Sequence, residues 1–535
     1  MLHLVFARSR RAGRIVTAVV VALLLAGIVA RVAGAQQGPI TFVYLRGTDT
    51  LATETITPGN DVVKGVLQYT GQPRLEWEQL RTPLRLTLSV FAAGSAADAA
   101  PMQAASFVPR GDSMAIELGM RGAMRPQVVP ARAGAVALIN NSLLHSALLT
   151  VVARERSGER GRTTLPVFLT QGGQLMDATV SMSGDTTRMT MGGLEMLTIW
   201  RDGVPIEVRV PAQNLRAVRA ASAVSLPPAT PVSYEAPADA PYTSESVSIV
   251  TPRGYTLAGT FTKPKGATGK GPVLVTISGS GPQDRDSRLP GITNYAIFRD
   301  LADTLGRRGI AVLRYDDRGV GQSGGKASRD SATSEDFADD VLSVVTFLRN
   351  RPDVDGDRIA LAGHSEGGLI APIAAVKDPR IKAIALLAGP AIDGRKVLVY
   401  QNENGIKAAP VTESQRDSLR RTIPAALDSL QRTNRWMRYF MTTDPLVMAK
   451  RVKQPVLILQ GDTDMQVTPE QADQLATALR TAGNRAVTVQ HFPATNHLFL
   501  EDASGSPTGY QSLTNTRVRK DVRGALAEWA VRILR

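Results

Sequence analysis

Five short apolar runs, separated by segments with helical spacing, constrain the fold of this 535-residue chain more than any other feature. The runs are residues 273–277, 311–315, 359–362, 383–387 and 456–460. Continuous apolar residues suit strands that are buried on both faces of a parallel sheet. The helical segments are residues 295–308, 334–349, 369–376, 469–482 and 516–534. This alternation predicts an α/β domain over residues 243–535, with a mostly parallel sheet and helices on both faces.

A long insertion separates the fourth apolar run from the fifth. Residues 389–453 carry mostly amphipathic helical patterns and no further apolar run of strand length. We therefore expect a helical cap here.

The first half of the chain has the period of half-buried strands instead. Leu86 and Leu88 alternate with polar neighbours, and Asp202-Gly203 lies between two apolar segments as a hairpin signal. One helix is predicted after Ser142, a suitable N-cap residue. These patterns predict a separate β-rich domain over residues 36–216, either a sandwich or a curved, partly open barrel. An Ala/Pro-rich linker is expected over residues 217–242.

The N-terminus has the organisation of a secretory signal peptide. Four arginines precede the apolar residues 15–30, and Ala33-Gly34-Ala35 provides a small-residue cleavage site. We expect residues 1–35 to be removed after export to the periplasm or the medium, with an uncleaved membrane anchor as the alternative. Removing the five arginines of this segment, which has no acids, lowers the net charge from +14 to +9. Because that surplus is dispersed and aromatic residues are only 5%, no nucleic-acid partner is expected.

The cysteine and histidine contents narrow the chemistry. The chain has no cysteine and five histidines, and it lacks a His-Glu-x-x-His pair. A thiol nucleophile and a Cys-ligated metal are excluded, and few ligands are left for any other metal site. We expect no metal and no cofactor.

Two segments match the pattern G-x-S-x-G of a nucleophile elbow, and their contexts differ. Ser365, in Gly363-His364-Ser365-Glu366-Gly367, follows an apolar strand and precedes a helix. That strand–turn–helix context is the one that an exposed nucleophile needs. Ser323 lies in a Gly-rich loop that continues into polar residues. The sequence therefore favours Ser365 as the nucleophile.

A serine nucleophile needs a base and a carboxylate that orients it, in the chain order Ser, acid, His for this architecture. Of the histidines after Ser365, His491 belongs to an alternating strand, whereas His497 lies in the following loop and is the predicted base. Asp462 and Asp464 both follow the strand at residues 456–460. Because they are two residues apart, strand alternation does not choose between them.

Residues 245–535 resemble the α/β-hydrolase superfamily, and within it bacterial secreted serine esterases that carry an N-terminal accessory domain. The matching segments are Ser278-Gly279-Ser280-Gly281-Pro282-Gln283, Tyr315-Asp316-Asp317-Arg318-Gly319, the elbow around Ser365, and Asn496-His497-Leu498-Phe499. The family's acid motif, G-x-x-D-x-x-V, matches at Asp464. The resemblance also implies an oxyanion hole formed by the N–H groups of Glu366 and Ser280, with Gly281 as the alternative to Ser280.

The resemblance suggests supporting roles for further residues. Asp317, Arg318 and Asp284 are expected to brace the active-site floor rather than to act on substrate. In the cap, Trp436, Tyr439 and Phe440 are candidates for an acyl pocket, and ordinary helix packing explains them equally well.

Together these features predict an enzyme that cleaves small-molecule carboxylic esters through an acyl-enzyme. A serine peptidase of the aminopeptidase or prolyl-oligopeptidase type, using the same Ser365, Asp464 and His497, is the alternative. A third possibility is a binding protein whose β-rich half captures a ligand, and the intact Ser/Asp/His set argues against it.

Overall fold

The computed structural model of this chain consists of two compact units, which we describe separately. It describes residues 38–535 except 48, 60, 93–94, 97, 121–122, 158–160, 172, 174, 222–225, 227–231, 290–291, 293, 330 and 409–412. The first unit ends at Val232 and the second comprises Ser233–Arg535. The expected signal segment, residues 1–35, lies outside the described residues. No helix among the described residues is both long enough and apolar enough to cross a membrane.

The described strands of the first unit all belong to one 15-stranded sheet. They are β1 (Ile40–Arg46), β2 (Asp49–Thr57), β3 (Val62–Tyr69), β4 (Arg74–Leu80), β5 (Arg85–Phe91), β6 (Gln103–Arg110), β7 (Ser113–Met120), β8 (Ala123–Pro130), β9 (Val136–Leu138), β10 (Thr163–Leu169), β11 (Leu175–Ser183), β12 (Thr186–Met191), β13 (Leu194–Arg201), β14 (Val204–Val210) and β15 (Leu215–Arg219). Strands that are consecutive in the chain pair with one another except β8 and β9, which are the two edges of the sheet. β15 pairs with β1, and among these strands only β9 and β10 run parallel. The sandwich of two sheets is therefore wrong. One sheet with two edges agrees with the alternative, a curved, partly open barrel.

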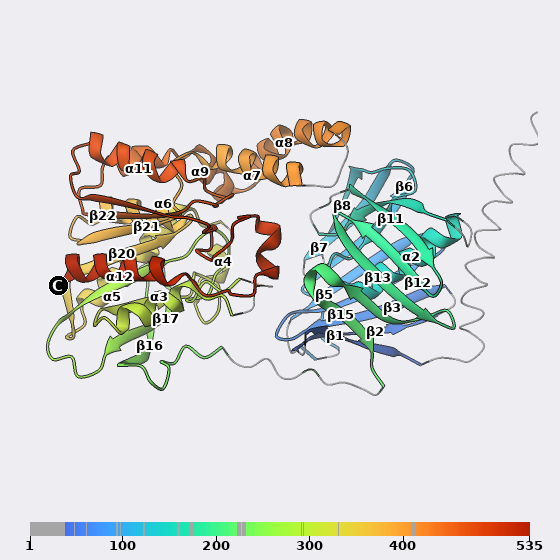
Figure 1. Cartoon of the computed structure of the whole chain (residues 1–535), viewed down its shortest axis with the longest axis horizontal. Helices are drawn as coiled ribbons and strands as arrows, with labels where there is room; N and C mark the ends of the chain where they lie inside the picture. The colour runs from blue at the N-terminus through green and yellow to red at the C-terminus, as the bar shows by residue number, and fades with distance from the viewer. Residues whose placement is uncertain are drawn as a thin grey trace, which may run out of the picture. The chain divides into compact units, whose positions relative to one another are not determined.

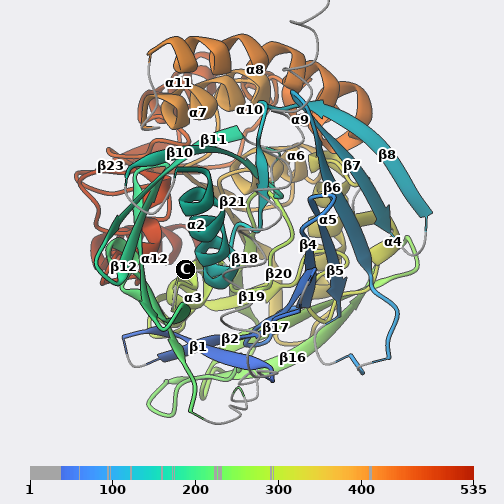
Figure 2. The same cartoon turned by 90° about the vertical axis from the view of Figure 1, so that its right-hand side faces the viewer.

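The sheet curves around one helix, α2 (Leu143–Ser157), as Figure 2 shows. The ring of Phe107 on β6 lies 6.2 Å from that of Phe168 on β10, so distant parts of the sheet meet across the hollow. Leu144, Ala147 and Leu149 of α2 are buried there. As predicted, Ser142 caps the helix, because its Oγ accepts the N–H of His145 at 2.8 Å.

The second unit is built on an eight-stranded sheet in the order β16-β17-β19-β18-β20-β21-β22-β23 (Figure 1). Its strands are β16 (Tyr242–Val250), β17 (Thr256–Pro264), β18 (Gly271–Ile277), β19 (Ala311–Tyr315), β20 (Val354–His364), β21 (Ala383–Leu387), β22 (Val456–Gly461) and β23 (Val487–Phe492). β16, β17 and β19 pair antiparallel, and the pairs from β19 through β23 are parallel. A mostly parallel sheet is confirmed.

Helices cover both faces of this sheet, which explains the continuous apolar runs. They are α3 (Ile297–Gly306), α5 (Ser334–Arg349), α6 (Gly367–Lys377), α11 (Glu470–Thr481) and α12 (Lys520–Leu534). Val273 and Val275 pack into the core that α5, α6 and α11 share, whereas Leu274 packs with α3 and α12. Alternate side chains of one strand thus enter two different cores, and both faces must be apolar.

The predicted cap is helical. Between β21 and β22 the chain forms α7 (Gly394–Ala408), α8 (Glu413–Thr433), α9 (Arg435–Thr442) and α10 (Pro445–Ala449), of which α7, α8 and α9 lie together (Figure 1). Ile406, Ile423, Leu427 and Met441 form a small core between these helices.

The predicted linker, residues 217–242, needs correction at both ends. Ala217 lies inside β15, where it is paired with Tyr44 of β1 on one side and with Val208 of β14 on the other. At the other end, Tyr242 is the first residue of β16. Within the segment, Tyr234 donates a hydrogen bond to Asp284 at 3.2 Å, and its ring lies 4.2 Å from the Arg285 guanidinium. Residues from Ser233 onward therefore pack as part of the second unit, and an Ala/Pro-rich composition did not reveal this.

Candidate active site

Ser365 lies in a strained turn between β20 and α6. Its φ angle is +55°, a region that L-residues other than glycine seldom adopt. Glycines permit the turn: a Cβ on Gly363 would lie 2.0 Å from the Gly367 carbonyl oxygen, and one on Gly367 would lie 2.3 Å from that of Ile277. The predicted strand–turn–helix context of Ser365 is therefore present, and no other residue type fits at these two glycines.

Ser323, the second match to the pattern, has a different environment. Its hydroxyl donates to the carbonyl oxygen of Asp316 at 2.7 Å and accepts the N–H of Ala258 at 2.9 Å. The side chain thus stabilises the loop after β19. This agrees with the sequence context, which favoured Ser365 as the nucleophile.

His497 and Asp464 form a buried pair. Nδ1 of His497 lies 2.8 Å from Oδ2 of Asp464, and the two side chains are 5% and 0% exposed. Asp464 also accepts the N–H groups of Gln466 and Val467, at 2.8 and 2.9 Å, through its other oxygen. These bonds hold the carboxylate in one orientation, as the orienting acid of a triad requires.

The structure distinguishes Asp462 from Asp464, the two candidates between which strand alternation did not choose. Asp462 lies 3.1 Å from Nδ1 of His491, where both side chains are partly exposed to solvent. Only Asp464 contacts His497. Two carboxylate–histidine pairs therefore form near the ends of β22 and β23. One of them is buried, and its histidine lines the same cavity as Ser365.

His364, the residue before Ser365, connects the elbow to the His497 loop, which the sequence did not predict. Its Nε2 donates to the His497 carbonyl oxygen at 2.9 Å, and the two rings are 4.9 Å apart. Burial, together with the neighbouring His497, lowers the pKa of His364 to about 3. The ring is neutral at physiological pH and adds no positive charge beside His497.

The loop of residues 278–283, which follows β18, passes close to Ser365. A Cβ on Gly279 would lie 3.0 Å from that of Ser365. Asp317 clamps both ends of the loop, because its carboxyl group is 2.5 Å from the Ser278 hydroxyl and accepts the Gln283 N–H at 3.0 Å. Burial raises the pKa of Asp317 to about 8, although both hydrogen bonds counteract this. The bracing expected of Asp317 is present as a clamp on this loop.

Arg318 and Asp284 also make structural contacts. The Arg318 guanidinium donates to Asp340 at 2.7 Å, and both side chains are buried. Asp284 accepts the N–H of Arg288 at 3.0 Å, in addition to its contact with Tyr234. Neither residue lines the cavity at Ser365.

The Glu366 side chain occupies the junction of three segments. Its two oxygens accept hydrogen bonds from the hydroxyls of Ser280 and Ser334 at 2.7 and 2.6 Å, and from the Trp436 indole at 2.8 Å. These partners come from the 278–283 loop, α5 and the cap. The residue is 3% exposed. The sequence predicted a role only for its backbone N–H, and the carboxylate contacts required distant segments to meet.

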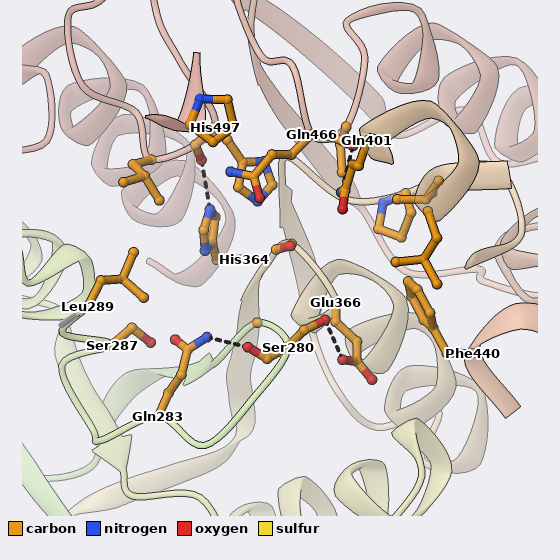
Figure 3. A pocket seen from close by; sticks show the side chains of 18 of the residues that line it. Ser280, Gln283, Ser287, Leu289, His364, Glu366, Gln401, Phe440, Gln466 and His497 are labelled. Atoms are coloured by element: carbon orange, nitrogen blue, oxygen red, sulfur yellow. Dashed lines mark hydrogen bonds between the residues drawn. The ribbon is translucent and has the colours of Figure 1, made fainter. Parts of the chain in front are cut away.

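A cavity of about 370 Å³ opens in front of Ser365 and His497 (Figure 3). Its apolar lining includes Leu289, Val397, Leu398, Met437 and Leu498, and its polar lining includes Gln283, Gln401 and Gln466. Trp436 and Phe440 line it too, with their rings stacked 5.9 Å apart. Tyr439, which the sequence grouped with them, is not among the lining residues. The described lining contains neither lysine nor arginine.

Comparisons with known proteins give one matching family model and several relatives among hydrolases. Residues 291–504 match the family model described as serine aminopeptidase, S33. Esterase EstD of Thermotoga maritima is 31% identical over 312 residues, which cover 57% of this chain and 72% of that protein. Thiohydrolase apmlB of Arthrinium phaeospermum is 34% identical over 144 residues, or 26% of this chain and 41% of that protein. Among solved structures, Pyrococcus furiosus esterase Pf2001 is 17% identical with a TM-score of 0.39, covering 57% of this chain and 96% of that one.

Proposed function

Because the chain belongs to the α/β-hydrolase superfamily of esterases and related hydrolases, we propose that it hydrolyses carboxylic esters through an acyl-enzyme on Ser365. The observation that carries this proposal is the buried His497–Asp464 pair, 2.8 Å apart, in the wall of the cavity that Ser365 also lines. A strained serine, an oriented histidine and a shared cavity are the parts that nucleophilic acyl transfer requires.

The reaction has two half-reactions. His497 takes the proton of Ser365 Oγ as the oxygen attacks the ester carbonyl, and the resulting imidazolium is stabilised by Asp464. His497 then returns the proton to the departing alcohol, which leaves the acyl group on Ser365. In the second half, His497 removes a proton from water, the hydroxide attacks the acyl carbon, and the carboxylic acid departs as Ser365 is reprotonated.

The negative oxygen of each tetrahedral intermediate needs hydrogen-bond donors. Glu366 is the N-cap of α6, and a backbone N–H at that position has no partner within its helix. Ser280 lies at the middle of the loop that Asp317 clamps, and its hydroxyl bonds to the Glu366 carboxylate. We assign the two donors to the N–H groups of Glu366 and Ser280, both in the cavity lining.

A serine peptidase is the second candidate, and the description of the matching family model favours it. An aminopeptidase needs a carboxylate that is free to bind the substrate's amine. Glu366 is the acidic residue in the cavity lining, and its oxygens already accept three hydrogen bonds. We therefore rank ester hydrolysis above amide hydrolysis.

The deciding experiment compares p-nitrophenyl esters with aminoacyl p-nitroanilides on the wild-type chain and on Ser365→Ala. We expect the wild type to cleave the esters and not the anilides, and Ser365→Ala to lose ester cleavage and labelling by a fluorophosphonate probe. Full ester cleavage by Ser365→Ala contradicts the proposal. Anilide cleavage in the absence of ester cleavage establishes the peptidase instead.

Export is a separate proposal. It rests on the arginines, the apolar residues 15–30 and the small residues that precede Gln36. Mass measurement of the native protein is expected to give a chain that begins at Gln36. An intact N-terminus on protein recovered from the cytoplasm contradicts this.

A further inference from the structure

A second cavity lies beside the catalytic one, across the loop of residues 278–283. Its volume is about 310 Å³, which is within the range of small-molecule pockets. Its lining includes the apolar or aromatic side chains of Ile277, Pro282, Tyr315, Val320, Ala332, Phe337, Ile370 and Trp436. The polar side chains in the lining are Ser278, Asp317, Arg318, Arg329, Glu366 and Asn434. Ser365 and His497 do not line it, so the mechanism above leaves this space without a function.

Four acidic or basic residues line the second cavity, and each of them already has a partner: Asp317, Arg318, Arg329 and Glu366. Asp317 bonds to Ser278 and Gln283, and Arg318 bonds to Asp340 while its guanidinium lies 5.4 Å from the Phe337 ring. The lining therefore offers a charged ligand no group without a partner. The chemistry of the cavity therefore suits an apolar group.

The two cavities share one wall. Gly279, Glu366 and Trp436 line both of them. Trp436 belongs to cap helix α9, is half-buried, and holds its place through one hydrogen bond to Glu366 and through stacking on Phe440. The indole is the largest side chain in the shared wall, and it comes from the cap.

The mechanism sets the direction in which an acyl chain leaves Ser365. His497 must reach the alcohol oxygen to protonate it, so the alcohol lies on the His497 side. The acyl chain then extends away from His497. Figure 3 shows His497 and Glu366 on opposite sides of the pocket, so this direction leads to the wall of Glu366 and Trp436.

We propose that the second cavity receives the distal part of a medium-chain acyl group, and that Trp436 is the gate between it and the catalytic cavity. This inference rests on the proposed ester hydrolysis and adds its substrate class: esters of medium-chain, apolar carboxylic acids. Each methylene that enters the second cavity is expected to raise kcat/KM about fourfold, from the transfer free energy of a buried CH₂.

The first test fills the second cavity. Ala332 is buried in its lining and far in sequence from the elbow and the cap. In Ala332→Phe we expect the ratio of kcat/KM for p-nitrophenyl decanoate to that for p-nitrophenyl acetate to fall tenfold or more. An unchanged ratio in a variant that still hydrolyses the acetate overturns the inference. If Ala332→Phe does not fold, Val320→Phe fills the same cavity and the same ratio decides.

The second test opens the gate. Trp436→Ala is expected to raise the decanoate-to-acetate ratio, and Trp436→Phe, which keeps a ring but loses the bond to Glu366, to raise it less. In the double variant Trp436→Ala/Ala332→Phe the gain is expected to disappear. An equal gain in both backgrounds shows that the chain lies elsewhere and overturns the inference. These outcomes are distinct from failure of the proposed function, which would appear as no Ser365-dependent ester cleavage at any chain length.

Discussion

Each unit of this protein buries a carboxylate and a histidine in one cluster, and the two clusters differ in whether the histidine contacts the carboxylate and in what lies beside it. In the first unit, Glu54 is fully buried and accepts bonds from the Ser142 hydroxyl at 2.6 Å, the Trp77 indole at 2.9 Å and the Tyr44 hydroxyl. His145 packs against Trp77, with ring centroids 5.1 Å apart. In the second unit, Asp464 is equally buried, but its histidine faces the cavity that Ser365 lines.

The comparison shows that burial and a shifted pKa do not by themselves make a site. Burial raises the pKa of Glu54 and lowers that of His145 to about 3. The Glu54 cluster joins the N-terminus of α2 to the curved sheet, and its polar groups bond to one another. Asp464 instead holds His497 in one orientation, and His497 lines the cavity that Ser365 also lines. We therefore assign stability to the first cluster and catalysis to the second, and four measurements test this division.

The largest effect is expected from Asp464→Asn. An amide cannot hold His497 in the tautomer that accepts the Ser365 proton, so kcat is expected to fall about 10⁴-fold. Asp462→Asn is the matched control, because Asp462 contacts the partly exposed His491. Its kcat is expected to stay within about threefold of the wild type. Comparable losses in the two variants, measured on one p-nitrophenyl ester, would contradict the assignment.

Removal of the first-unit carboxylate is expected to affect stability alone. Glu54→Ala leaves the buried donors of Tyr44, Trp77 and Ser142 without their partner, which costs about 3 kcal/mol. Urea unfolding measures the loss, and kcat on a short ester at 25 °C is expected to be unchanged. Glu78→Ala, which removes an exposed ion pair with Lys64, is the control and should cost about 0.5 kcal/mol or less. A drop in kcat with unchanged stability would reverse the division.

A smaller effect is expected at the tether of the His497 loop. His364→Phe keeps an aromatic ring but removes the bond from Nε2 to the His497 carbonyl oxygen. Because small displacements of a catalytic base are costly, kcat is expected to fall about tenfold with KM unchanged. His491→Phe, in the exposed pair, is expected to have no effect on kcat. Equal kcat values for the two variants would show that the tether does not position His497.

The smallest change in kcat is expected from Asp317→Asn, and this change depends on pH. The folded-state pKa of about 8 lies above the unfolded value near 4, so the contribution of this group to stability is greatest below pH 4 and decreases as the pH rises to 8. Asp340 and Glu366 repel the ionised form. The wild type is therefore expected to lose stability relative to Asp317→Asn between pH 5 and pH 8. Above pH 8, ionisation of Asp317 beside the loop of residues 278–283 should lower the kcat of the wild type about threefold. The kcat of Asp317→Asn should not change over this pH range. Parallel pH profiles would contradict this.

Much of the second unit was predictable because its signals are local. The strands Ala311–Tyr315 and Ala383–Leu387 and the helix Ser334–Arg349 have the bounds that periodicity gave them. The antiparallel pair β16 and β17 was not predicted, because its strands lack a continuous apolar run. In the first unit the sequence predicted the β13–β14 hairpin but not which distant strands approach one another across the curved sheet. The contact of Phe107 with Phe168 joins β6 to β10, and no local pattern encodes it.

Local sequence patterns were enough to predict the parts of the candidate site: an elbow whose glycines allow a strained Ser365, a histidine in the loop after β23, and two carboxylates after β22. The packing of the folded unit was needed to show which carboxylate contacts His497, that Asp317 clamps the loop of residues 278–283, and that Glu366 joins this loop to Trp436 in the cap. The difference arises from distance along the chain. Sequence spacing determines which residues share a face of one strand or one helix. The hydrogen bond between Trp436 and Glu366 joins residues 70 positions apart, so it forms only when the whole unit has packed.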